Sequence, residues 1–443
     1  MDRREFLKKA GLGAAVLGMG ACAPRVLKDE DDKSVAVTDG KVVSHYDGVG
    51  LLGYGCMRWP VVKGEDERSH IDQDEVNALV DYALEHGVNY FDTSPVYLEG
   101  DSERATAQAL NRHPRSEWLL ATKLSNFSDF SYDNSVKMYR KSLEIFNTDH
   151  VDYYLLHALS GGDDFRRRFG ETGIMDFLLK EREAGHIRNL GFSFHGPESG
   201  FNELMALHEK YHWDFVQIQM NYVDWTHAGK GNASAKFLYN ELDSREIPII
   251  IMEPLRGGRL ADLPAALSDE LKARDPQSSL ASWAFRFVGS FPRVKCVLSG
   301  MTYMNHLQDN LSTFIGFKPL DEEEKEFLEI TAEKMENYPL VRCTGCQYCM
   351  PCPYGINIPA IFKFYNDNVN AGTYVVSKEQ QGYARTRRKY LLAYDKAIPS
   401  VRQADHCISC GRCVPACPQK IAIPRELRRI DNYIETLKRE DFQ

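Results

Sequence analysis

Between residues 49 and 315 the sequence alternates regularly between two kinds of segment. Short runs rich in β-branched and aromatic residues end in polar residues, and a stretch of helical periodicity follows each of them. Eight such repeats predict a (β/α)8 barrel, an architecture that typically needs about 250 residues. The runs with strand character are 51–57, 88–93, 118–123, 151–157, 187–194, 215–220, 248–253 and 294–299.

The stretches with helical periodicity carry the boundary residues that helices need. Ser, Thr, Asp and Asn stand near several of their starts, where they cap free backbone N–H groups. Gly87 and Gly185 follow two of the ends, as residues after a helix often do. The helical stretches include 74–86, 103–111, 133–146, 172–184, 201–210, 233–245, 279–288 and 304–315.

An open, doubly wound sheet alternates in the same way and is the competing fold. Residues 48–53 even spell G-x-G-x-x-G, the pattern of a dinucleotide-binding turn. That turn must lead directly into a helix, whereas Pro60 follows shortly after the motif and prevents one. We therefore reject the dinucleotide fingerprint and favour the barrel.

Four titratable side chains follow three consecutive strand-like runs. Asp92 ends the second run and leads to Tyr97, Lys123 ends the third, and His157 ends the fourth. Barrel enzymes build their sites at the carboxyl ends of the strands, so all four should meet at one rim. Any one of these side chains, on its own, would more often have a structural role. Four of them at one rim indicate a catalytic site.

The four residue types suit proton transfer to a carbonyl oxygen. A phenol has a pKa near 10, and a neighbouring ammonium would lower the pKa of Tyr97. Asp92 would hold Lys123 as its ion-pair partner, and His157 would orient the carbonyl oxygen. No residue stands out as a nucleophile paired with a base, so the pattern does not favour acyl transfer.

Eight of the eleven cysteines lie in two closely spaced runs near the C-terminus. The second run has the C-x2-C-x2-C-x3-C-P spacing of bacterial ferredoxins, in which the fourth cysteine binds the other cluster. The first run has one residue fewer before its last cysteine. The sequence thus predicts two 4Fe-4S clusters with crossed ligands, one on Cys343, Cys346, Cys349 and Cys417, the other on Cys352, Cys407, Cys410 and Cys413.

Structural zinc is the rival interpretation, because two C-x2-C pairs can also form a site of four thiolates. Two features favour iron–sulfur clusters over zinc: each run contains three evenly spaced cysteines, and the second run ends in x3-Cys-Pro. A disulfide framework is favoured less than either metal site. Two segments between the runs, 359–366 and 383–394, have helical character and predict a mainly helical ferredoxin-type domain. Cys56 and Cys296 fall within the barrel region, where small buried cysteines are ordinary.

The N-terminus resembles an export signal. Arg3 and Arg4 precede a Gly/Ala-rich apolar run, 10–21, that is too short to cross a membrane as a helix. Residues 19–22 resemble a lipoprotein cleavage box with Cys22 as the lipidated residue, and 29–33 form a charged tether. The expectation is twin-arginine export to the periplasm or the outer side of the cytoplasmic membrane. A basic tail with a short buried helix is the alternative.

The composition narrows the function classes further. A net charge of −9 makes the chain a poor candidate for binding nucleic acid. An apolar share of 43% with 26% charged residues describes a globular chain and not a multi-span membrane protein. We expect a signal and tether at 1–33, a barrel at 45–320 and an iron–sulfur domain at 321–443.

The tetrad of Asp92, Tyr97, Lys123 and His157 resembles that of the aldo/keto reductases, which are NAD(P)H-dependent barrel enzymes. The resemblance extends over residues 49–315 and implies reduction of small carbonyl compounds or oxidation of alcohols. It implies that Ser193 and Gln217 bind the nicotinamide carboxamide and that the eighth-strand loop holds the adenosine phosphate. The matching cofactor residues are Gly55, Cys56, Met57, Ser193, Gln217, Pro254, Leu255, Ser299, Gly300 and Asn310.

Several positions depart from the family pattern. Phe194 replaces an Asn for the carboxamide, and Met252 replaces an aromatic ring that stacks on the nicotinamide. Gly300 and His306 replace the basic pair that many members use for a 2′-phosphate. The choice between NAD and NADP, and the alternative of an inactive site, therefore stay open.

The barrel and the cysteine-rich end together resemble a branch of the aldo/keto reductases with a 4Fe-4S module. Nicotinamide passes two electrons as one hydride, whereas a cluster passes one, and no flavin motif connects them. Either the clusters are structural or a redox partner protein accepts single electrons. The second hypothesis is an electron-transfer subunit with the barrel as a scaffold. Binding of NADPH or NADH distinguishes the two.

Overall fold

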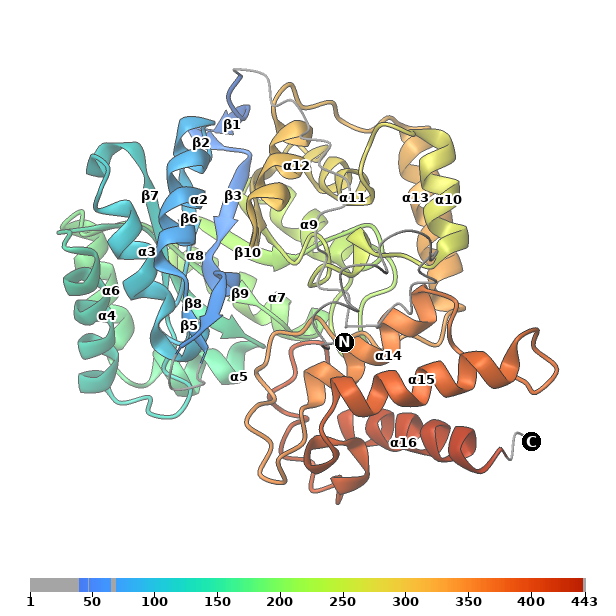
Figure 1. The fold of residues 1–443 in the computed structure, drawn as a ribbon. Helices are drawn as coiled ribbons and strands as arrows, with labels where there is room; N and C mark the ends of the chain where they lie inside the picture. The colour runs from blue at the N-terminus through green and yellow to red at the C-terminus, as the bar shows by residue number, and fades with distance from the viewer. Residues whose placement is uncertain (1–39, 47, 65–68, 441–443) are drawn as a thin grey trace, which may run out of the picture.

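The computed structural model describes residues 40–46, 48–64 and 69–440, and its central part is a closed barrel (Figure 1). Every pair of adjacent barrel strands runs parallel. The predicted barrel is confirmed, while the predicted signal, tether and Cys22 lie outside the described residues. In order around the barrel the strands are β10 (Phe215–Gln219), β11 (Ile249–Met252), β12 (Val294–Ser299), β3 (Leu52–Gly55), β6 (Tyr90–Asp92), β7 (Leu119–Leu124), β8 (Val151–Leu159) and β9 (Ile187–Phe194).

The barrel is filled by its own inward side chains. Tyr153 lies between Tyr90 and Phe215, with ring centroids 4.8 and 5.1 Å apart, and Ile250 and Cys296 belong to the same buried cluster. Both faces of the strands are covered, which explains why they read as nearly continuous apolar runs. The interior is therefore packed, and chemistry is confined to the rim.

Helices cover the outside of the barrel and begin at capping residues. The Asp72 carboxylate accepts from the backbone N–H of Glu75, and Ser131, Ser234 and Ser279 cap three further helices in the same way. The main helices are α2 (Gln73–Glu85), α3 (Ser102–Leu110), α4 (Tyr132–Phe146), α6 (Ile174–Glu183), α7 (Glu198–Ala206), α9 (Ala235–Asp243), α11 (Leu280–Gly289) and α12 (Met304–Phe314).

The structure also contains small strands and short helices that the eight predicted strand–helix repeats do not include. Two small hairpins join β1 (Ser44–Tyr46) to β2 (Val49–Gly50) and β4 (Val61–Lys63) to β5 (Ser69–Ile71). Short helices α5 (Gly162–Phe165) and α8 (His208–Tyr211) and the longer α10 (Ala265–Arg274) lie between strands. The first predicted strand is shorter than expected, because the chain turns at Cys56–Arg58.

Helix α13 (Glu322–Glu336) belongs to the barrel and not to the C-terminal domain. Leu328 and Met335 lie in the barrel's outer core, and the Phe327 ring lies 5.8 Å from that of Trp283. The guanidinium of Arg286 donates to the Glu324 carboxylate at 2.9 Å. The expected boundary at residue 321 is therefore too early, since the second core begins at Val341.

The C-terminal domain is mainly helical, as predicted, and lies against one end of the barrel (Figure 1). Helices α14 (Ile358–Asn370), α15 (Tyr383–Ala397) and α16 (Ile423–Arg439) surround a separate apolar core. The side chain of Asn357 caps α14, and Pro359 follows at its first turn. The cysteine runs lie in the loops that precede α14 and α16.

The domain meets the loops that follow the barrel strands. Thr344 accepts a hydrogen bond at its carbonyl from Arg58, which follows β3. The Asn232 amide, in the loop after β10, donates to the Pro418 carbonyl at 2.8 Å. The C-terminal domain thus covers the rim at which a barrel site forms. Among the described residues, we find no helix with the length and apolarity needed to span a membrane.

Candidate functional site

The predicted ion pair lies at the rim, buried between two adjacent strands. Lys123, on β7, donates from Nζ to Asp92 Oδ1 at 2.6 Å and to the Thr93 carbonyl at 2.7 Å. Lys123 is completely buried and Asp92 is 3% exposed. The ammonium charge is thus met by a carboxylate and a carbonyl, as a buried charge requires.

Tyr97 lies in the turn after β6, where the chain bends through the left-handed region. Leu98 and Glu99 have φ values of 50° and 58°, which turns the backbone sharply after the tyrosine. The Lys123 ammonium lies 4.9 Å from the centre of the Tyr97 ring. The His157 ring meets the Tyr97 ring edge-on, with centroids 5.8 Å apart. The structure therefore brings together all four predicted tetrad residues.

Burial dominates the electrostatics of this site. It raises the pKa of Tyr97 well above the ordinary value, with further contributions from Tyr348 and Asp92. The expectation that Lys123 lowers the pKa of this phenol is therefore wrong, because burial dominates and Asp92 neutralises the ammonium. Burial also lowers the pKa of His157, aided by Lys123 and Arg168. The site therefore holds a neutral phenol and a neutral imidazole.

His157 is held at both ring nitrogens. Nδ1 lies 2.6 Å from Ser125 Oγ and 3.4 Å from Ser94 Oγ. Nε2 lies 3.3 Å from the hydroxyl of Tyr348. The two serines fix the ring plane and leave Nε2 directed at the mouth of the barrel.

Tyr348 is the site residue that the sequence pattern did not reveal. It lies between Cys346 and Cys349, where it reads only as a spacer in the cysteine run. Its hydroxyl lies 3.3 Å from Nε2 of the His157 ring, and its side chain also interacts electrostatically with Tyr97. A side chain of the C-terminal domain therefore joins two members of the barrel tetrad.

Further contacts fasten the same cysteine segment to the rim. Gly257 follows β11 with φ +72°, and a Cβ there would overlap the Thr344 carbonyl. Gln419, beside Cys417, donates to Gln219 at 2.8 Å and to Glu253 at 3.0 Å. Burial and the neighbouring Asp224 raise the pKa of Glu253 to about 7. The rim and the cysteine segments are thus complementary surfaces.

The residues proposed for the nicotinamide lie on adjacent strands, β9 and β10. Ser193 Oγ accepts from the Ala158 N–H at 2.8 Å, and Gln217 Oε1 is buried with no hydrogen-bond partner. A carboxamide N–H group is the donor that such an oxygen lacks, so these residues fit the cofactor. Phe194 instead packs against Phe201 of α7, with centroids 5.0 Å apart.

The remaining predicted cofactor residues lie around the same rim. Asn310 donates to Ser299 Oγ at 2.8 Å, which ties α12 to the end of β12. Gly300 lies against the aliphatic part of Arg58. Gly55 is the last residue of β3, Cys56 and Met57 follow it, and Pro254 and Leu255 lie after β11. Cys56 is fully buried, as Cys296 is, and burial raises its pKa.

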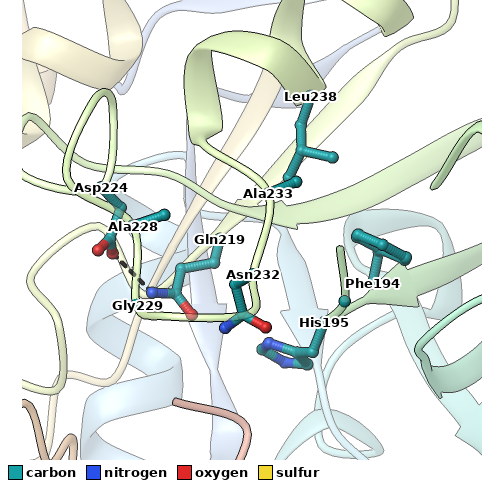
Figure 2. Close-up of a pocket in the computed structure, with 10 residues that line it drawn as sticks. Phe194, His195, Gln219, Asp224, Ala228, Gly229, Asn232, Ala233 and Leu238 are labelled. Carbon is teal, nitrogen blue, oxygen red and sulfur yellow. Dashed lines mark hydrogen bonds between the residues drawn. The ribbon is translucent and has the colours of Figure 1, made fainter. Parts of the chain in front are cut away.

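A small pocket of about 20 Å³, partly open to solvent, lies between the loops that follow β9 and β10 (Figure 2). Gln219 donates to Asp224 at 2.6 Å on one side, and His195 and Asn232 lie on the other. Burial lowers the pKa of His195 to about 4, so this ring is neutral. The pocket adjoins the Gln219–Gln419 contact between the two domains.

The eight predicted cluster cysteines fall into two groups in space. In what we call the inner group, Cys343, Cys346 and Cys349 interact electrostatically with Cys417. In the outer group, Cys413 interacts with Cys407, Cys410 and Cys352, and all four line one apolar hollow. The grouping matches the crossed ligand sets, so the thiols fit two clusters.

The thiols differ in burial. Burial raises the pKa of both Cys346 and Cys349 to about 12, whereas Cys410 is exposed. Bound iron would have to hold the inner thiols deprotonated. No three His, Cys, Asp or Glu side chains of the described residues are spaced to hold a single metal ion.

Comparison with known protein families gives two matches along the chain. The model of the aldo/keto reductase family matches residues 51–332, and that of a 4Fe-4S dicluster domain matches residues 342–423. The two matches coincide with the barrel, including most of α13, and with both cysteine runs.

Individual relatives are distant but cover the barrel. L-Galactose dehydrogenase of Arabidopsis thaliana is 24% identical over 64% of this chain and 90% of its own length. The holo form of an aldo-keto reductase from Bacillus halodurans has a TM-score of 0.51 at 20% identity, covering 64% of this chain and 92% of the other. An aldo/keto reductase from Klebsiella pneumoniae, solved with NADP and acetate, has a TM-score of 0.50 at 19% identity, covering 64% and 91%.

Proposed function

The chain belongs to the aldo/keto reductase family and carries a 4Fe-4S dicluster domain, and we propose that it transfers hydride between a nicotinamide cofactor and a small carbonyl or alcohol substrate. The observation that carries this proposal is the assembled tetrad. Lys123 is 2.6 Å from Asp92, and the Tyr97 and His157 rings meet at the same rim.

In the direction of reduction, a nicotinamide held by Ser193 and Gln217 would supply the hydride to the carbonyl carbon. The Tyr97 hydroxyl donates its proton to the carbonyl oxygen, which becomes the alcohol. His157, neutral because burial lowers its pKa, presents Nε2 to the same oxygen and orients it. Lys123, which Asp92 holds in place 4.9 Å from the centre of the Tyr97 ring, offsets part of the phenolate charge after the proton has left.

A neutral, buried phenol is suited to this role. Its raised pKa means that it keeps its proton at neutral pH until an alkoxide develops beside it. In the direction of oxidation, Tyr97 must lose its own proton before it can take one from the alcohol, and its raised pKa disfavours that step at neutral pH. Ser193 and Gln217 would hold the carboxamide, with the unpaired Gln217 oxygen as acceptor. The assignments of Gly55, Cys56, Met57, Pro254, Leu255, Ser299, Gly300 and Asn310 to the rest of the cofactor are part of the proposal.

Tyr97→Phe tests the mechanism. The variant keeps the ring against Lys123 and His157 and removes the proton, so kcat should fall by about 10²–10⁴-fold without loss of folding. Tyr132→Phe is the matched control, because this exposed tyrosine begins the outer helix α4 and its ring packs against that of Phe177. An unchanged rate for Tyr97→Phe with an aldehyde and NADPH would refute the tetrad assignment.

Binding of the cofactor separates an enzyme from a scaffold. The anaerobically purified protein should bind NADPH or NADH at equilibrium, and which of the two binds more tightly decides cofactor choice. If neither binds, the barrel serves as a scaffold for an electron-transfer subunit.

We further propose that the two thiol groups each hold a 4Fe-4S cluster, the inner on Cys343, Cys346, Cys349 and Cys417 and the outer on Cys352, Cys407, Cys410 and Cys413. A bound cluster supplies single electrons, so a redox partner protein would exchange them with the outer group. Iron and sulfide analysis of brown, anaerobically purified protein tests this. Zinc in an amount equimolar with the protein, with no iron or sulfide, would contradict the assignment of 4Fe-4S clusters.

We propose that Arg3 and Arg4 direct the folded, cluster-loaded protein through the twin-arginine route, with Cys22 as a site of lipid attachment. Substituting both arginines by lysine should retain the protein in the cytoplasm. Failure of Cys22→Ser to alter membrane association would contradict the anchor alone.

A further inference from the structure

The hydroxyl of Tyr348 stands between the two side chains that the proposed mechanism assigns to the substrate oxygen. It lies 3.3 Å from His157 Nε2, and the Tyr348 side chain is close enough to Tyr97 for the two phenols to interact electrostatically. A carbonyl oxygen would need the same two partners. The phenol oxygen therefore occupies the position in which a substrate oxygen would be held.

The backbone that carries Tyr348 is fixed from both sides. Thr344 accepts from Arg58 at its carbonyl, and its hydroxyl lies 3.5 Å from the Glu253 carboxylate. Cys346 and Cys349, on either side of the tyrosine, belong to the inner thiol group. The position of Tyr348 is therefore set by the docking of this segment against the barrel. Tyr348 is not a surface side chain that reaches the barrel by chance.

We propose that Tyr348 makes an autoinhibitory contact in the reduction site, in which its hydroxyl holds the place of the carbonyl oxygen until a substrate displaces it. This inference rests on the proposed function, because Tyr97 and His157 are the two partners. It also defines the ligand class: a small molecule enters only if it brings an oxygen that bonds to both residues.

Displacement has a consequence for the inner thiol group. Tyr348 is flanked by two of its cysteines, so a substrate that replaces the hydroxyl removes one of the contacts that hold the 343–349 segment against the barrel. Occupancy of the barrel site and the conformation of the inner cluster's ligand segment are then linked. Such a link is reciprocal in binding free energy.

Tyr348→Phe tests the displacement by separating KM from kcat. The variant keeps the ring, whose centroid lies 6.4 Å from that of His157, and removes only the competing hydroxyl. With NADPH and 4-nitrobenzaldehyde, KM should fall by about three- to tenfold while kcat stays within about twofold. Tyr132→Phe should change neither. An unchanged or higher KM, or a large loss of kcat, would overturn the proposal, since Tyr348 would then be structural or a proton donor.

A second measurement needs no turnover and therefore distinguishes failure of this inference from failure of the proposed function. Sodium acetate, whose oxygens accept from both Tyr97 and His157, should raise amide hydrogen exchange in residues 343–352 of the full-length holoprotein. Sodium chloride at equal ionic strength should not. In Tyr348→Phe, exchange should be high already and acetate should add little. Unchanged exchange in the wild-type protein with acetate would overturn the proposal, whereas inactivity with every aldehyde tested would count against the proposed function only.

Discussion

The inner and outer thiol groups have the same residue types and related spacings but opposite surroundings. The inner group lies under the barrel rim, where burial raises the pKa of Cys346 and Cys349 to about 12. The outer group faces the surface, with Cys410 exposed and the neighbouring Ile408 62% exposed. One group is part of an interface between domains, and the other is open to a partner.

The difference shows what the C-terminal domain adds to the barrel. The segments around the inner cysteines bring Tyr348 against His157, and Thr344 and Gln419 against Glu253, so residues near these cysteines cover the barrel site. The outer group has no comparable contacts with the barrel among the hydrogen bonds of the described residues.

Serine substitution at one cysteine of each group should give the largest contrast. Cys417→Ser and Cys413→Ser should each remove about half of the iron, because each removes one ligand of one cluster. Metal binding at structural zinc sites contributes about 10 kcal/mol or more to folding. We expect the loss of one cluster to destabilise the segments around it by a comparable free energy. Only Cys417→Ser should expose residues 343–352 to limited proteolysis. Equal cleavage in both variants would break the distinction between the groups.

Replacing Glu253 should sharpen the comparison through pH. The buried carboxyl has its pKa raised to about 7 in the folded protein, so folding favours its protonated form. Its contribution to stability is complete below the ordinary value of 4.5 and is lost as pH rises through 7. Glu253→Gln should therefore raise the free energy of unfolding at pH 8 by about 2 kcal/mol, with little effect near pH 5.

Anaerobic urea unfolding of the holoprotein at both pH values measures this difference. The exposed Glu144 offers a control, because Glu144→Gln should not change the pH dependence. A Glu253→Gln variant that is less stable than the wild type at pH 8 would show that the carboxylate is ionised and fully paired at the interface.

Gln419→Ala should have a smaller effect. It removes the amide that bonds Gln219 and Glu253 across the interface, and a cost of about 1–2 kcal/mol is expected. Gln403, which donates to the Ile398 carbonyl within the C-terminal domain, provides the comparison. Only the Gln419 variant should increase hydrogen exchange in the rim loop around residues 253–257. Equal exchange there in both variants would contradict the interface role.

Ile408→Ser should have the smallest effect on stability. The side chain is exposed beside the outer group, so the free energy of unfolding should change by less than about 0.5 kcal/mol. Thermal unfolding of the holoprotein measures it. A larger loss would mean that another surface covers the outer group in solution.

Much of the fold and the tetrad was predictable because both depend on local pattern and chain order. Strand and helix periodicity gave the barrel, and the rule that sites form at the carboxyl ends of strands brought Asp92, Tyr97, Lys123 and His157 together. The crossed grouping of the cysteines followed from ferredoxin spacing. These inferences need no knowledge of how the two domains dock.

What the sequence did not reveal depends on that docking. Tyr348 reads as a spacer between cysteines, and nothing in its neighbours indicates a barrel partner more than 180 residues away. Helix α13 was assigned to the wrong domain because its periodicity does not say which core it packs against. The direction of the Tyr97 pKa shift was wrong because burial, which dominates it, is a tertiary property.

The central claim is that the inner thiol segment closes the barrel site, and electron paramagnetic resonance of the reduced holoprotein tests it most directly. The inner signal is identified by its absence in Cys417→Ser. Saturating acetate should change the inner signal and leave the outer one as it was. If acetate leaves both unchanged, or alters both alike, the inner segment is not coupled to the barrel mouth.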